Sequence, residues 1–338
     1  MKTVRLRSTI FAAASLFVFL PIAISASVLA ATPAKSQPAS AMANGMRISP
    51  LRSDITIAAG SSGKVDVSVT NVTKSTVSLR PIENDFVASG EAGEPALILD
   101  SNSYAPSHSL KRFMVPLSPF TVAPGQTQTV SVNIIVPKTA QAGGYFGALR
   151  FAPTSLNGPA GSGAAVGESV GSLILLTIPG PTVEQLTLTN FDVQQNGGTA
   201  TNFRTPSNLA LLLRFQDKGN LQEAPFGQIY VQKGNKVLYT YNFNGNSPKD
   251  EVLPDSARRW IIPLKNIGKF GKYTVGATFT YGTKGQSIDI TKTVWIIPMV
   301  IIMSIAGGVV ILIAIGVGLY MFLKSYKRKI LRSSRRRY

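Results

Sequence analysis

Polar and apolar residues alternate one by one along much of the chain between residues 46 and 297. The alternation is clearest in residues 64–70 (KVDVSVT), 127–136 (TQTVSVNIIV) and 271–281 (GKYTVGATFTY). A repeat of two places successive side chains on opposite faces of a β-strand. Turn residues interrupt the repeat about every ten residues, and no stretch combines a repeat of 3.6 with helix caps. The pattern predicts an all-β fold of short strands.

Proline and glycine divide this β region in two. Pro179-Gly180-Pro181 contains two residues without a backbone donor, so we place a domain boundary near residue 180. The predicted domains are two tandem Ig-like β-sandwiches, over residues 46–180 and 181–297. The Gly/Ala/Ser-rich stretch 154–169 is the alternative boundary, and we interpret it as a long hairpin loop. The candidate strands of the second sandwich are 183–188, 208–215, 226–232, 236–243, 257–263, 271–281 and 287–297, with a tight turn at 233–236 (KGNK).

Both ends of the chain carry apolar segments. Residues 299–323 contain no charge, and residues 324–338 contain eight Lys and Arg and no acid. An uncharged run of this length can cross a bilayer as a helix, and a basic flank marks its cytoplasmic side. Residues 1–30 have a positive start, an apolar stretch and a small-residue end, which is typical of a signal peptide. An uncleaved anchor is the alternative for this segment.

These segments predict a single-pass type I protein of the cell membrane, with its ectodomain on the extracellular face and residues 324–338 as a basic cytoplasmic tail. Residues 31–45 are rich in Ala, Pro and Ser and indicate a flexible lead-in. We expect Trp295, Lys324, Lys327 and Arg328 at the membrane interface, where aromatic rings and cations are favoured. The alternative for Trp295 is a place in the protein core.

The net charge of +18 comes mainly from the two ends. The first 30 residues contribute +3 and the last 15 contribute +8, which leaves +7 for the rest, with 23 basic and 16 acidic residues. No basic helix with interleaved aromatics occurs, which argues against nucleic-acid binding. The +7 region would attract an anionic polymer at low salt, although a dispersed basic surface also serves solubility. The absence of cysteine excludes disulfides, thiol catalysis and cysteine-zinc sites.

Residue types that carry catalysis are sparse. His108 is the only histidine, and no acid is patterned to orient it, so a loop histidine is the favoured interpretation. Glu83 and Asp85 would share a strand face, as paired catalytic carboxylates do, but we favour a solvated strand end. The acids at 250, 251 and 255 lack the spacing of a calcium loop. We predict no catalytic residues, no metal site and no cofactor.

Several short motifs occur in the predicted first sandwich. They are Ile48-Ser49-Pro50, the strands around residues 60–71, the turn Pro124-Gly125-Gln126, and Val136-Pro137 followed by residues 143–148 (GGYFGA). The order of a signal peptide, two sandwiches, one helix and a basic tail resembles that of the WxL-interacting proteins of Gram-positive bacterial surfaces. The similarity at the level of residues covers about 46–152. The resemblance implies peptidoglycan binding by the first domain and binding of a host or partner protein by the second.

We therefore expect a non-enzymatic, membrane-anchored surface protein. Its first sandwich would bind peptidoglycan, an anionic wall polymer or a partner surface protein. Tyr145 and Phe146, flanked by glycines, are the candidate ligand-binding residues, and alternation requires that one of the two face the core. The alternatives are a structural spacer or scaffold subunit of a membrane complex and, less favoured, a cell-wall-acting enzyme.

Overall fold

The computed structural model describes residues 41–43, 45–154 and 169–334, with side chains over 45–154 and 169–328. The chain divides into two compact units, Met1–Gln37 and Pro38–Tyr338, and all described residues belong to the second. The predicted signal peptide therefore lies outside the described residues, as do most of the lead-in and the end of the basic tail. Residues 41–43 of the lead-in correct the expectation of flexibility, because they form a strand.

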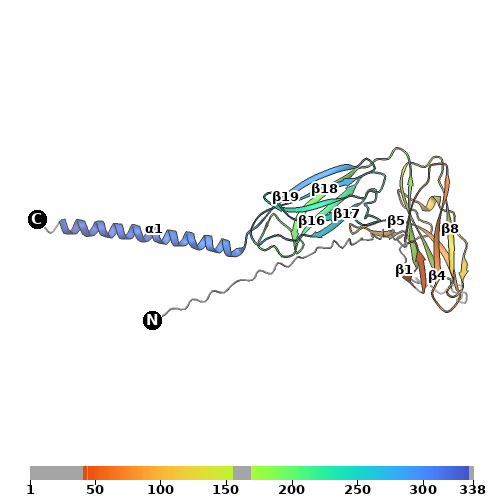
Figure 1. The fold of residues 1–338 in the computed structure, drawn as a ribbon, viewed down its shortest axis with the longest axis horizontal. Coiled ribbons are helices and arrows are strands. Elements are labelled where there is room, and N and C mark those ends of the chain that lie inside the picture. The colour runs from red at the N-terminus through yellow and green to blue at the C-terminus, as the bar shows by residue number, and fades with distance from the viewer. Residues whose placement is uncertain (1–40, 44, 155–168, 335–338) are drawn as a thin grey trace, which may run out of the picture. The chain divides into compact units, whose positions relative to one another are not determined.

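The first sandwich is built from two sheets (Figure 1). One has the order β1-β2-β4-β8 and is antiparallel throughout. The other has the order β3-β10-β9-β5-β6, with β7 also paired to β5 and with β3 parallel to β10. The bounds are β1 Ala41–Ala43, β2 Met46–Ser49, β3 Arg52–Thr56, β4 Ser62–Asn71, β5 Val77–Ser89, β6 Glu94–Leu97, β7 Phe120–Val122, β8 Thr127–Ile135, β9 Gly143–Pro153 and β10 Val170–Ile178, with one 3-10 turn, η1, at Lys111–Phe113.

Alternation in β4 buries Val65, Val67 and Val69 between the two sheets. Strands β9 and β10 pair antiparallel, which confirms the hairpin interpretation, although most of the loop between them lies outside the described residues. Residues on both faces of β9 are buried. One face joins the core, and Phe146 and Ala148 on the other belong to a buried cluster against which Leu253 of the second sandwich packs.

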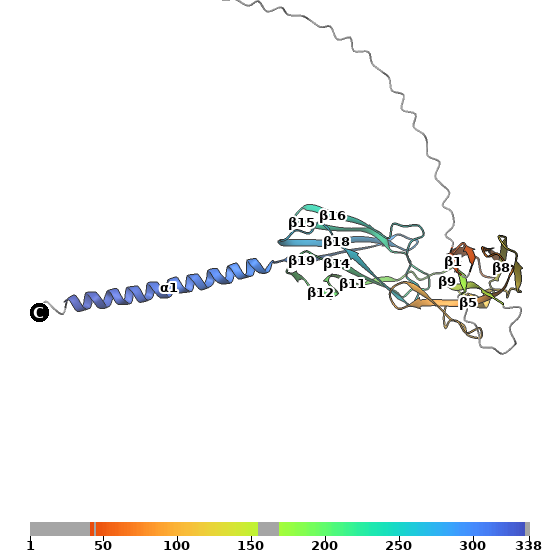
Figure 2. The same cartoon turned by 90° about the horizontal axis from the view of Figure 1, so that it is seen from below.

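The second sandwich also has two sheets, with the orders β12-β11-β14-β17 and β13-β19-β18-β15-β16 (Figure 2). Most strand predictions are confirmed within two residues at each end, and the turn at 233–236 joins β15 to β16 with Gly234 at φ +57°. The short β12 and β13 were not predicted. The bounds are β11 Leu186–Gln195, β12 Gly198–Thr199, β13 Asn202–Phe203, β14 Leu209–Asp217, β15 Phe226–Lys233, β16 Lys236–Phe243, β17 Ala257–Pro263, β18 Gly271–Tyr281 and β19 Gln286–Ile296.

Aromatic rings fill the centre of this second core. Phe215 lies 5.2 Å from Phe279 and 5.9 Å from Trp260, measured between ring centroids, and both pairs meet edge to face. The alternating residues of β18 form one buried face, as predicted. Trp295, on β19, is 42% exposed and so lies outside the core.

Helix α1, Met299–Ser334, follows the second sandwich. It is longer than predicted, because the helix continues from the apolar segment into the basic tail. Among the described residues, one stretch, Met299–Arg328, is long and apolar enough to cross a membrane. Lys324, Lys327 and Arg328 are exposed along this part of the helix, and the ammonium of Lys324 lies 5.7 Å from the ring centroid of Tyr320.

Candidate binding surface of the first sandwich

A long loop, residues 98–119, joins β6 to β7, and a buried carboxylate holds it in place. Asp85 of β5 is fully buried. Its Oδ2 accepts hydrogen bonds from Ala105 N (2.9 Å) and Ser109 Oγ (2.6 Å), and its Oδ1 accepts one from Lys111 N (2.8 Å). Three donors to one carboxylate satisfy a charge that would otherwise be costly to bury.

The two residues before Asp85 fix the ends of the same loop. The Asn84 amide donates to Ile98 O (2.7 Å), and Glu83 Oε1 accepts a hydrogen bond from Leu117 N (3.1 Å). The expectation of a solvated strand end at Glu83 and Asp85 was therefore wrong. These two side chains bind loop groups 20 to 34 residues away, which no local pattern in the sequence shows.

The anchored loop presents one aromatic ring with two cations, which we call the Tyr104 cluster (Tyr104, Lys111 and Arg112). Tyr104 is 45% exposed. The Arg112 guanidinium carbon lies 4.4 Å from its ring centroid and the Lys111 ammonium lies 4.9 Å from it, within the range of cation–π attraction. The Lys111 ammonium also donates to Ser101 O (2.6 Å) and Ser103 O (3.0 Å), so the cluster is ordered before any ligand arrives.

Phe113, which follows Arg112 in η1, belongs to a half-buried group of rings from the loop and β9. The ring of Tyr145 lies 5.0 Å from Phe113 and 6.1 Å from His108, between centroids. The Tyr145 hydroxyl donates to Gln141 O (3.0 Å), and partial burial raises its pKa. His108 Nδ1 lies 2.6 Å from Gly144 O, which makes it a loop histidine with a backbone partner.

Of the two candidate ligand-binding residues, Tyr145 reaches the surface and Phe146 is 3% exposed. Phe146 packs on Phe86 at 5.8 Å between centroids, on the outer face of the sheet. Ligand binding by this pair stays a prediction. Of the two side chains, only that of Tyr145 is accessible to a ligand.

The glycines before Tyr145 serve contact with the second sandwich. Gly144 N donates to Asn220 O (2.8 Å), and the Asn220 amide donates to Ala142 O (2.9 Å). A Cβ on Gly143, which has φ +141°, would lie 2.5 Å from Asn220 O. Only glycine allows the two backbones to approach this closely. We call these contacts the Asn220 joint.

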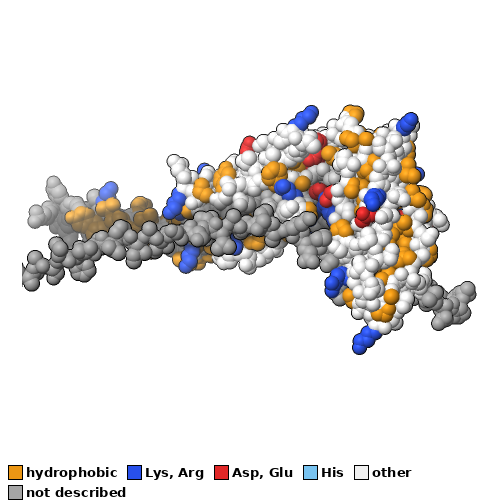
Figure 3. Space-filling view, turned by 45° about the vertical axis from the view of Figure 1, so that its right-hand side comes forward, with side chains coloured by type: hydrophobic (Ala, Val, Ile, Leu, Met, Phe, Trp, Pro, Cys, Tyr) orange, Lys and Arg blue, Asp and Glu red, His pale blue; other side chains and the backbone are white. Residues whose placement is uncertain are grey.

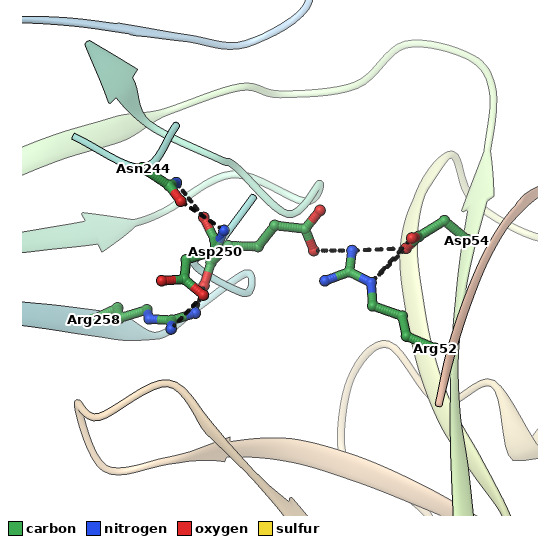
Figure 4. A network of polar contacts seen from close by, with 6 residues as sticks. Arg52, Asp54, Asn244, Asp250 and Arg258 are labelled. Carbon is green, nitrogen blue, oxygen red and sulfur yellow. Dashed lines mark hydrogen bonds and ion pairs between the residues drawn. The ribbon is translucent and has the colours of Figure 1, made fainter. Parts of the chain in front are cut away.

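Ion pairs add to the contact between the sandwiches. Arg52 of β3 binds Asp54 and Glu251, each at 2.7 Å, and Arg214 of β14 binds Glu91 at 2.7 Å. Burial raises the pKa of Glu251, against the opposing effect of Arg52. Figure 4 shows Arg52 beside Asp54, and Asp250 between Asn244 and Arg258. On the face drawn in Figure 3, acidic and basic side chains lie next to one another among hydrophobic ones.

Asp250 therefore binds Arg258, and Glu251 binds Arg52. Over the part of the chain that the structure describes, no group of three or more His, Asp or Glu side chains is arranged to hold a metal ion.

We expect Asn220→Ala to lower the free energy of unfolding by about 1–2 kcal/mol, because it removes the bond to Ala142 and a second bond in which Asn220 Oδ1 accepts from Val183 N (2.8 Å). Urea denaturation of the full chain in detergent measures the change. Asn133→Ala is the matched control, because Asn133 is exposed on β8, and it should change stability by less than about 0.5 kcal/mol. Equal effects of the two substitutions would contradict the joint.

No family model matches this chain, and no curated protein matches it. Among solved structures, it is similar to the class 5 fimbriae chaperone CfaA, at 11% identity and TM-score 0.38, over 75% of this chain and 99% of that one. The E. coli chaperone DraB has 13% identity and TM-score 0.31, over 74% and 96%. A Salmonella enterica complex of SafA pilin with the SafB chaperone has 11% identity and TM-score 0.33, over 75% and 95%. At these identities and TM-scores, the likeness carries no argument about what this chain binds.

Proposed function

We propose that this protein is a non-enzymatic component of a bacterial cell surface that binds an anionic wall polymer through the Tyr104 cluster and the neighbouring Tyr145. The observation that carries the proposal is the loop 98–119, which three adjacent polar residues of β5 hold in place. Side chains ordered in advance lose little conformational entropy on binding. The two cations attract phosphate or carboxylate groups, and the ring adds apolar contact area.

Membrane attachment by α1 is part of the same proposal. Its apolar part is long enough to span a hydrocarbon core, and Lys324, Lys327 and Arg328 follow on the side expected to be cytoplasmic. The sandwiches would then lie on the extracellular face. The resemblance to WxL-interacting proteins is in line with this arrangement and with a wall-binding first domain.

A partner surface protein is the second candidate ligand, and one observation favours it. Strand β16 lies at the end of its sheet, and Val237 on it is 53% exposed. Edge strands of this kind accept an added strand from another chain. A structural spacer or scaffold subunit that binds no polymer would use such an edge alone.

The test is cosedimentation of the full chain, in detergent, with isolated Gram-positive walls at low and high salt. We expect Arg112→Ala and Tyr104→Ala each to weaken retention by about tenfold, since each removes a side chain that is exposed in the cluster. Arg80→Ala is the matched control, because Arg80 is exposed on β5 of the same sandwich. Walls stripped of anionic polymer distinguish that polymer from peptidoglycan.

The outcomes separate the candidates. Retention that survives salt and depends on Arg112 but not on Arg80 supports a specific site. Retention that is lost in salt, with equal effects of the two arginines, would reduce binding to the +7 charge. Wild-type protein that does not sediment with walls would contradict polymer binding and leave the partner protein.

A further inference from the structure

The second sandwich contains a pocket that the proposed function does not use. Its volume is about 250 Å³, and it lies against the turn between β18 and β19. Acidic, amide and apolar side chains line it together with one lysine. The residues that matter here are Glu184, Gln222, Glu223, Phe226, Lys249 and Thr283.

Glu223 is the unusual member of this set. It is 3% exposed, and its Oε1 has no hydrogen-bond partner among the residues that the structure describes. Gln222 does not share this role, because its Oε1 lies beside Gly144 of β9. Glu184, by contrast, is satisfied, because Thr283 donates to it from both N (3.0 Å) and Oγ (2.6 Å). A buried acceptor without a donor destabilises the fold, and it does so more strongly when it is charged.

The surrounding charges make the pocket favourable for a cation. Asp217 is fully buried near Glu223, and its own Oδ2 has no partner. Burial, followed by the charges of Asp217 and Glu184, raises the pKa of Glu223 to about 7. Lys249 is the one cation among the residues that line the pocket, and its ammonium lies 4.7 Å from the ring centroid of Phe226.

We propose that this pocket binds a primary alkylammonium group, such as the side chain of a lysine. An ammonium has three N–H donors and no acceptor, which suits the unpartnered acceptor of Glu223. Glu223 supplies the opposite charge, and Phe226, with Leu221 and Ala224, provides apolar surface for the alkyl stem. The ammonium can belong to a lysine in another protein chain or to a free amine.

Calorimetric titration of the full chain in detergent, at about pH 8 where Glu223 is ionised, tests the proposal. Nα-acetyl-lysine amide probes a peptide-borne ammonium, n-butylamine probes a free amine, and Nα-acetyl-norleucine amide is the uncharged control. We expect the lysine probe to bind and the norleucine probe not to bind. Glu223→Gln should weaken the affinity about tenfold or more, because it removes the charge and keeps the shape.

Glu94→Gln is the matched control, since Glu94 is exposed on β6, and it should leave the affinity unchanged. Thermal unfolding of each variant confirms that it is folded. Lys249→Met removes the competing ammonium and should strengthen binding of the lysine probe. Unchanged affinity in Glu223→Gln overturns the proposal. Absence of binding by the wild type also overturns the proposal. If only Lys249→Met binds the lysine probe, the side chain of Lys249 itself occupies the pocket, and the proposal is overturned in that case too.

Discussion

Replacing Asp85 with alanine is expected to release the loop 98–119 from the first sandwich and to lower the free energy of unfolding by about 3 kcal/mol. The substitution leaves Ala105 N, Ser109 Oγ and Lys111 N without their acceptor. Removal of the buried charge offsets part of this loss, because Asp85 no longer has to be desolvated. The net effect remains large, since a single carboxylate serves three donors across seven residues of the loop.

Chemical denaturation of the full chain in detergent measures this loss, and hydrogen exchange measures the release of the loop amides. Asp66→Ala is the matched control. Asp66 is exposed on β4, where Ser131 Oγ donates to it, and the change should be less than about 0.5 kcal/mol. We also expect Asp85→Ala to lose wall retention, because the Tyr104 cluster is no longer held. Protected loop amides in Asp85→Ala would contradict the anchoring role.

The strands were predictable because their signal is local. In β18, every second residue from Tyr273 to Tyr281 packs into the core, and the sequence displays that repeat directly. The parallel pairing of β3 with β10 was not predictable. It joins Arg52 to Leu173, which lie 121 residues apart, and nothing in either segment specifies its partner.

The candidate site was predicted only in part. Alternation indicated that Tyr145 or Phe146 would be buried, but the choice depends on how β9 packs. Tyr145 takes a half-buried place against Phe113, and Phe146 is covered on the outer face of the sheet, where Leu253 of the second sandwich packs. Here contact between domains buries a sheet face that would otherwise meet solvent.

The same contact accounts for glycine and acidic residues whose structural roles the sequence did not show. Gly143 and Gly144 flank the candidate ligand-binding residues Tyr145 and Phe146, and in the structure these glycines allow close approach to Asn220. Glu251 and its acidic neighbours lack the spacing of a calcium loop, and the structural partner of Glu251 is Arg52 of the first sandwich. Residues that mediate contact between domains show the same types as residues that bind ligands, so composition alone cannot separate the two.

Stability is expected to rise as the pH falls from about 8 to about 5, by about 5 kcal/mol, because of two buried carboxyls. Burial is the largest cause for both, and it raises the pKa of Asp217 and of Glu223 to about 7 each. The folded state therefore binds these protons more tightly than the unfolded state. The stabilisation is complete below the ordinary pKa of the carboxyls and is lost as the pH rises through about 7.

The range from pH 5 to pH 8 distinguishes Asp217 and Glu223 from the other acids with shifted pKa values. The Lys292 ammonium lowers the pKa of Asp192, and the Ser103 hydroxyl lowers that of Asp100, so both stay ionised from pH 5 to pH 8. Denaturation midpoints of the full chain at several pH values measure the effect. The double variant Asp217→Asn, Glu223→Gln mimics the protonated pair and should remove most of the slope. A variant that kept the wild-type slope would place the titrating groups elsewhere, with Glu251 as the next candidate, because burial also raises its pKa.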